Sequence, residues 1–142
     1  MNEMTPEEWR RFLLTGSRTG KLATVRPDGR PSVVPIWFTL EGSDLLFTTG
    51  ERTLKARNIR ANPAVAVSVD EESFPYAFVL VEGRASLDAL PPPELLPWTT
   101  RIAERYVGKQ RADAYGRRNA VDGELLVRVP MTRIVARKGI AD

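Results

Sequence analysis

The chain has 142 residues and a formal net charge of +3, and it contains neither histidine nor cysteine. Its own side chains therefore cannot form a Ser-His-Asp triad, a thiol nucleophile, an iron–sulfur cluster, a disulfide or an imidazole-ligated haem. With 42% hydrophobic and 27% charged residues the composition is that of a globular protein, and the length predicts one domain over residues 1–142.

The first predicted element is a helix that begins after Thr5. Thr5 is a good N-cap, Pro6 suits the first helical position, and two acids follow in the first turn. This acidic opening is not the pattern of a signal peptide, and no window approaches the ~20 apolar residues that a membrane-spanning helix needs. We therefore expect a cytoplasmic protein without a membrane partner. Its small positive charge favours anionic partners but does not indicate nucleic acid.

The next segment predicts a three-stranded meander. Its β-rich runs cover residues 22–25, 32–40 and 45–49, and the turn sequences "RPDGRP" and "EGSD" separate them. Pro35 lies within the second run. Because proline cannot donate to a strand ladder, it predicts an edge strand or a bulge there.

The rest of the chain predicts a short helix, three more strands and a helical insert. The helix covers residues 53–61 and ends at Asn62-Pro63. The insert, residues 91–118, should form one or two helices and line one side of a groove. The three further strands cover residues 64–72, residues 76–87 with a bend at Gly83, and residues 123–139 with an interruption at Pro130. Six strands with turn-rich connections predict a mainly β fold, a small antiparallel barrel with short helices.

The helix at residues 53–61 carries the main candidate site. Its apolar stripe is thin, and a basic helix face is most often simply solvated. However, the helix follows a strand that ends in Thr48 and Thr49. Free backbone N–H groups, the helix dipole, two hydroxyls and the Lys55/Arg57 pair could therefore converge on one point, which is typical of a phosphate site. The residues alone leave both interpretations open.

A second candidate is the sequence "VPIWF" at residues 34–38. Trp37 and Phe38 could be core or interface aromatics, or the strand could present a flat wall to a planar ring. Neither a Rossmann G-x-G-x-x-G sequence nor a Walker-type loop occurs, so those nucleotide sites are not expected. The acidic residues do not form a recognisable metal site. The arginines of the last third are surface charges or contacts to a ligand or a partner subunit: Arg117, Arg118, Arg128 and Arg133.

Three segments in order carry a family resemblance: "KLATVRPDGRPSVVPIWF", "LLFTTGERTLKARNIRANPAVAVSV" and "VEGRASL". Together they resemble the flavin and deazaflavin oxidoreductases of the pyridoxamine 5′-phosphate oxidase-like superfamily. The resemblance extends over roughly residues 5–138. It implies an FMN-binding-like, six-stranded antiparallel split β-barrel that forms a homodimer with two cofactor sites at the subunit interface.

The resemblance also implies which residues bind the cofactor. The phosphate would be held by Lys55 and Arg57, with Thr48, Thr49 and Asn58 in support. The ring would lie against Val34, Pro35 and Trp37, and Arg128 and Arg133 would reach the ligand from the partner subunit. No catalytic side chain is assigned and no metal is expected.

The resemblance also implies a reaction class. True pyridoxamine 5′-phosphate oxidases carry a C-terminal Arg-rich substrate motif with a histidine, which this sequence does not show. Short members of the superfamily instead often depend on the deazaflavin coenzyme F420. The resemblance therefore implies an F420-dependent reductase that transfers a hydride to a small planar or unsaturated substrate. The alternatives are an FMN-dependent oxidoreductase and a non-catalytic F420- or FMN-binding protein.

Overall fold

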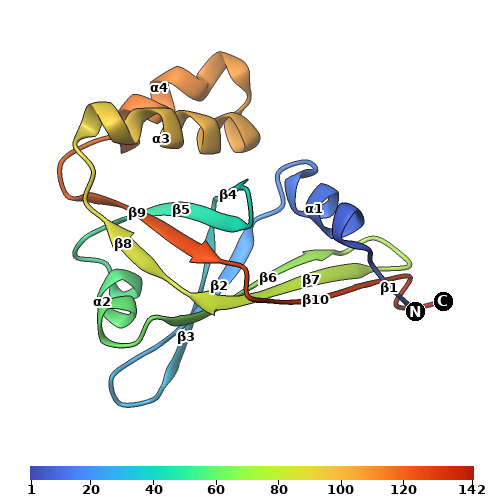
Figure 1. The fold of residues 1–142 in the computed structure, drawn as a ribbon. Coiled ribbons are helices and arrows are strands. Elements are labelled where there is room, and N and C mark those ends of the chain that lie inside the picture. Colours follow the sequence, from blue (N-terminus) through green and yellow to red (C-terminus); the bar gives the residue numbers. More distant parts are fainter.

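The computed structural model describes residues 1–142 and contains ten strands and four helices (Figure 1). The strands are β1 (Asn2–Glu3), β2 (Gly20–Val25), β3 (Pro31–Ile36), β4 (Thr39–Glu41), β5 (Asp44–Gly50), β6 (Ala64–Glu71), β7 (Ala77–Arg84), β8 (Ser86–Asp88), β9 (Glu124–Pro130) and β10 (Arg133–Lys138). The helices are α1 (Pro6–Leu14), α2 (Leu54–Ala61), α3 (Pro92–Val107) and α4 (Lys109–Asn119). No helix is both long and apolar enough to cross a membrane.

The strands form two antiparallel sheets, which confirms the expected mainly β split barrel. One sheet has the strand order β1-β10-β7-β6-β2-β3 and the other the order β4-β5-β9-β8. The structure has ten strands rather than the expected six, because three predicted strands, at residues 32–40, 76–87 and 123–139, are each broken in two and the short N-terminal strand β1 was not predicted. At every break the chain passes from one sheet to the other. A barrel with sharp corners needs such interruptions, since a regular twisted strand cannot belong to both sheets.

One of these corners is built around Gly83 and Pro130. β9 ends at Pro130, as the sequence predicts. A Cβ atom on Gly83 would overlap the Pro130 carbonyl oxygen and lie 3.0 Å from Cγ1 of Val129. Two residues after Pro130, the Thr132 amide and hydroxyl both donate to the Glu82 carbonyl at 3.1 Å. These two segments of the chain cross so closely that only glycine fits at position 83.

The core fills the space between the sheets. Its largest fully buried side chains include Phe38, Phe47 and Leu22, and α1 adds Leu13 from outside the barrel. The start of α1 is the expected one: the Glu8 amide donates to the Thr5 hydroxyl at 3.2 Å, and the Thr5 amide donates to the Glu8 carboxylate at 3.1 Å. This reciprocal pair is a capping box, and it fixes where the helix begins.

The helical insert forms a hairpin of α3 and α4 over one end of the barrel, above β5 and β9 (Figure 1). Leu95 of α3 packs against Leu46 and Leu126. The two helices are joined where the Thr99 hydroxyl donates to the Gly116 carbonyl at 2.8 Å. The insert is thereby placed as a roof beside the barrel strands that carry the candidate site residues.

We predict that Gly83→Ala lowers the free energy of unfolding by about 1–3 kcal/mol, the usual cost of overpacking a closed site. The displaced atom would be a backbone carbonyl, which cannot move aside as a flexible side chain can. Urea denaturation followed by circular dichroism measures the change. Gly50→Ala is the matched control, since a Cβ there meets Cγ2 of Thr53 at an ordinary 3.6 Å. Equal unfolding midpoints for the two variants would contradict this account of the corner.

Candidate functional site

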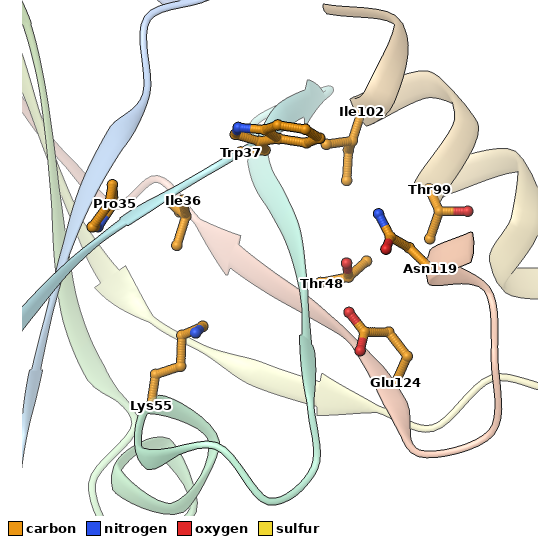
Figure 2. Close-up of a pocket in the computed structure, with 9 residues that line it drawn as sticks. All are labelled: Pro35, Ile36, Trp37, Thr48, Lys55, Thr99, Ile102, Asn119 and Glu124. Atoms are coloured by element: carbon orange, nitrogen blue, oxygen red, sulfur yellow. The ribbon is translucent and has the colours of Figure 1, made fainter. Parts of the chain in front are cut away.

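A cavity of about 280 Å³ lies between the barrel and the α3–α4 hairpin (Figure 2). Strands, the short helix α2 and the hairpin all contribute to it. Its lining consists of Pro35, Ile36, Trp37, Thr48, Lys55, Thr99, Ile102, Asn119 and Glu124. The expectation that the helical insert lines one side of the groove is confirmed, because Thr99 and Ile102 come from α3 and Asn119 ends α4.

Lys55 projects into this cavity from the first turn of α2, below the ring of Trp37 (Figure 2). The helix starts at Thr53, whose hydroxyl accepts a hydrogen bond from the Ala56 amide at 3.2 Å. The ammonium group of Lys55 forms no ion pair, although nine ion pairs occur elsewhere in the chain. A cation held without a partner in a cavity is suited to an anionic ligand.

Glu124 is the acidic residue of the lining, and the sequence interpretation did not identify it. It is the first residue of β9 and lies opposite Gly50 in the register of β5 and β9. Burial raises the pKa of the Glu124 carboxyl, and the Thr48 hydroxyl and the Lys55 charge only partly offset this. The one available signal in the sequence was an acid placed directly before the apolar run of the last strand, which is too common to indicate a site.

The upper wall of the cavity is an aromatic side chain in a fixed orientation. The Trp37 ring stacks on Tyr106 with 5.1 Å between centroids and 3° between planes. Tyr115 of α4 lies 6.5 Å from Trp37 at a tilt of 50°. Trp37 is nevertheless 37% exposed, so part of its surface remains free for a ligand.

Tyr106 and Arg105 fasten α3 to the point where β3 breaks before β4. The Tyr106 hydroxyl accepts from the Phe38 amide at 3.2 Å and donates to the Arg18 carbonyl at 3.0 Å. Arg105 donates to the Phe38 carbonyl and, at 2.8 Å, to the Leu13 carbonyl. Burial raises the pKa of Tyr106, which keeps its hydroxyl protonated as a donor. The roof of the cavity is therefore held by hydrogen bonds rather than by apolar packing alone.

Four of the eight cofactor-binding residues expected from the sequence meet in this cavity. Thr48, Lys55, Pro35 and Trp37 come from β5, α2, β3 and the residue after β3. They are separated by up to 20 positions in the chain, and the antiparallel folding of the meander brings them together.

The other four expected residues lie outside the lining. The Arg57 side chain is exposed, and Val34 packs against the hydrophobic core. The buried Thr49 hydroxyl is hydrogen-bonded to Thr53 at 2.8 Å. Asn58 is also buried, where its amide nitrogen donates to the Thr24 hydroxyl at 3.0 Å while its oxygen Oδ1 has no partner. Thr49 and Asn58 thus contact the strand end and α2 from the buried side, away from the cavity.

Two arginines considered as contacts from a partner subunit are paired within their own chain. Arg128 bonds Asp44 at 2.8 Å and Glu41 at 3.5 Å. Arg133 lies 3.5 Å from Glu82. No group of three or more acidic residues is arranged to bind a metal ion.

The family model of pyridoxamine 5′-phosphate oxidase matches residues 5–129 of the chain. The protein belongs to this family. Its fold is thus the flavin-binding split barrel of the pyridoxamine 5′-phosphate oxidase-like proteins.

Solved structures of related proteins agree with this assignment. The conserved hypothetical protein Rv2991 of Mycobacterium tuberculosis is 25% identical, with a TM-score of 0.82 over 96% of this chain and 86% of that chain. An F420 reductase is 33% identical, with a TM-score of 0.68 over 87% of this chain and 94% of that chain. The heme storage protein HutZ of Vibrio cholerae shares the fold at 20% identity, with a TM-score of 0.72 over 98% of this chain and 100% of that chain.

We predict that Tyr106→Phe destabilises this family member by about 1–3 kcal/mol, because the variant keeps the stack on Trp37 but leaves the Phe38 amide without an acceptor. Urea denaturation monitored by tryptophan fluorescence measures the loss. Tyr115→Phe is the control, since Tyr115 contacts Trp37 through its ring and its hydroxyl makes no hydrogen bond within the chain. Similar losses in both variants would mean that the Tyr106 hydroxyl does not fasten the hairpin.

Proposed function

We propose that the protein is an F420-dependent reductase that acts on small planar or unsaturated molecules. The observation that carries the proposal is the unpaired ammonium group of Lys55 in the same cavity as the Thr48 hydroxyl, with Trp37 and Pro35 also in the lining. This set of residues offers an anion contact and an aromatic wall within one cavity, which are the two contacts that a phosphorylated planar cofactor requires.

The phosphate contact is assigned to Lys55 and Thr48. Lys55 supplies a charge-assisted hydrogen bond, and Thr48 supplies a hydroxyl from the adjoining strand. The Thr53 cap fixes the first turn of α2 and so limits where the ammonium group can go. Arg57 is exposed on the same helix, so any contribution from its guanidinium is made from outside the cavity of its own subunit.

The ring contact is assigned to Pro35 and Trp37. Proline offers a flat apolar surface without a competing N–H group, and Trp37 is held in place by Tyr106. Ile36 and Ile102 add apolar surface that excludes water from the same cavity. When bound, F420 supplies two-electron hydride chemistry. The protein would contribute binding, orientation and a dry surface, for which neither histidine nor cysteine is required.

The similarity to an F420 reductase at 33% identity supports F420 rather than FMN as the cofactor. The alternative is an FMN-dependent oxidoreductase on the same scaffold, because a single lysine can bind the phosphate of either F420 or FMN. A protein that binds F420 without catalysis is the other alternative. An assay with reduced F420 and a panel of quinones and nitroaromatics distinguishes a reductase from a non-catalytic carrier. A carrier would bind F420 tightly and leave it reduced.

We predict that Lys55→Ala weakens the binding of F420 by about 10- to 150-fold, or about 1.5–3 kcal/mol, because a charge-assisted contact is lost. Fluorescence titration with oxidised F420 measures the dissociation constant without depending on turnover. Arg57→Ala, from an exposed position on the same helix, should weaken binding less.

Lys109→Ala is the matched control, since it removes an equal charge from an exposed position on α4. Unchanged affinity in Lys55→Ala would remove the phosphate assignment. Equal losses in Lys55→Ala and Lys109→Ala would mean that only the net charge of the protein matters. Tighter binding of FMN than of F420 by the unmodified protein would favour the FMN alternative.

The site is further proposed to lie at the interface of a homodimer. A cavity of about 280 Å³ lies just below the usual ~300–1,000 Å³ for ligand pockets, so a second surface would be needed to enclose a whole F420 or FMN molecule. The edge strand β3, which carries Pro35, also exposes Val33 to the extent of 63%.

Light scattering after gel filtration should give twice the chain mass of 15.9 kDa. The dimer should also persist when the protein is diluted to the concentrations used for the F420 titration. A monomer that binds F420 with undiminished affinity would contradict the interface site.

A further inference from the structure

The cavity holds one basic and one acidic side chain, and neither is neutralised by an ion pair. Lys55 and Glu124 both line it, together with uncharged residues. Neither takes part in any of the nine ion pairs of the chain. Figure 2 shows the Glu124 carboxyl beside Thr48, across the cavity from Lys55. An anion that binds at Lys55 must therefore share the cavity with a carboxyl group.

Glu124 is held in this position by the backbone. It begins β9 directly after Gly123. The carbonyl of Gly123 accepts a hydrogen bond at 2.8 Å from the amide of Glu51, which follows β5. Opposite it in the register is Gly50, and a Cβ at that position would lie 3.9 Å from the Glu124 carboxylate. The carboxyl thus lies over a residue without a side chain, which leaves it room at the border of the cavity.

The charged groups around Glu124 do not cancel its charge. On one side lies Lys55, whose charge acts on it without forming an ion pair. On the other side Glu124 borders an open pocket whose charged members are Glu51, Arg52 and Asp122. Burial raises the pKa of the Glu124 carboxyl, which is the expected sign for a group that is partly desolvated and incompletely paired.

We propose that Glu124 is a specificity residue that makes the site prefer a singly charged phosphodiester to a doubly charged phosphate monoester. This inference rests on the proposed function, in which the cofactor phosphate lies at Lys55. The phosphate of F420 is a diester, whereas that of FMN is a monoester. Glu124 would thus make the site discriminate between the two candidate cofactors, which the Lys55 contact alone does not do.

The physical basis is the net charge within the cavity. A monoester has a second pKa of about 6, so at pH 8 it carries nearly two charges. A diester carries one. The attraction of Lys55 and the repulsion of the Glu124 carboxylate both grow with ligand charge, and in a partly buried site neither is fully screened. With one cation and one carboxylate present, the second ligand charge gains little attraction and still loses its hydration.

The test compares two ligands with the same ring and different phosphate charge. These are FMN and riboflavin 4′,5′-cyclic phosphate, and riboflavin serves as the ligand without phosphate. Each displaces F420 from the full-length protein at pH 8, so weak binders are measured by competition. In Glu124→Gln we expect the affinity for FMN to rise about tenfold relative to that for the cyclic phosphate. The affinity for riboflavin should not change.

The matched control is Glu51→Gln. It removes the same charge from an exposed residue in the adjoining turn that does not line the cavity. It should leave the ratio of FMN to cyclic phosphate affinity unchanged. If Glu124→Gln does not fold, Glu124→Ala makes the same comparison, because glutamine and alanine both remove the carboxylate.

The outcomes separate this inference from the proposed function. An unchanged ratio in Glu124→Gln, or an equal change in Glu51→Gln, overturns the role of Glu124 while F420 binding by the unmodified protein stands. Failure of the unmodified protein to bind F420, FMN or the cyclic phosphate overturns the proposed function, and the role of Glu124 with it.

Discussion

The geometry of the site depends on how the chain satisfies the backbone groups of Phe38. At this residue β3 has ended and β4 has not begun, so strand pairing cannot supply partners. Buried amide and carbonyl groups without partners are costly. Tyr106 accepts from the amide and Arg105 donates to the carbonyl, and both come from α3. One break in a strand therefore turns Trp37 toward the cavity and also fixes the helical roof above it.

A second constraint is electrostatic. Most charged side chains of the barrel are paired across neighbouring strands, as Arg128 is with Asp44 and Arg133 with Glu82. Lys55 of α2 and Glu124 of β9 form no ion pair, and both line one cavity. Unpaired charges at partly buried positions destabilise a protein unless a ligand uses them. By the same reasoning, the charged groups of the cavity would contribute most of the binding energy of a ligand. The apolar wall would supply shape and exclude water.

The sequence predicted the helices and strands better than the positions where strands break and pass to the other sheet. Capping residues and turn signals set the start of α1 and the ends of the meander strands, because those interactions are local. The run at residues 32–40 was predicted as one strand, with an edge position or a bulge at Pro35. β3 does lie at the edge of its sheet, but the run is divided into β3 and β4 at Trp37 and Phe38. Its alternation of side chains carries no information about a change of sheet. Similarly, the roles of Thr49 and Asn58 depend on which side of the strand end and of α2 faces the core.

What the sequence by itself determined was the mainly β barrel, the family and the position of a basic helix start after a threonine strand end. These follow from local propensity and from motifs that lie in order along the chain. Only the tertiary structure decided that Lys55 enters the cavity while Arg57 stays outside. It also decided that Glu124, far from Lys55 in the sequence, lines the same cavity. The physical reason is that a cavity is formed by side chains from strands and helices distant in sequence, whose proximity is set by sheet register and helix docking.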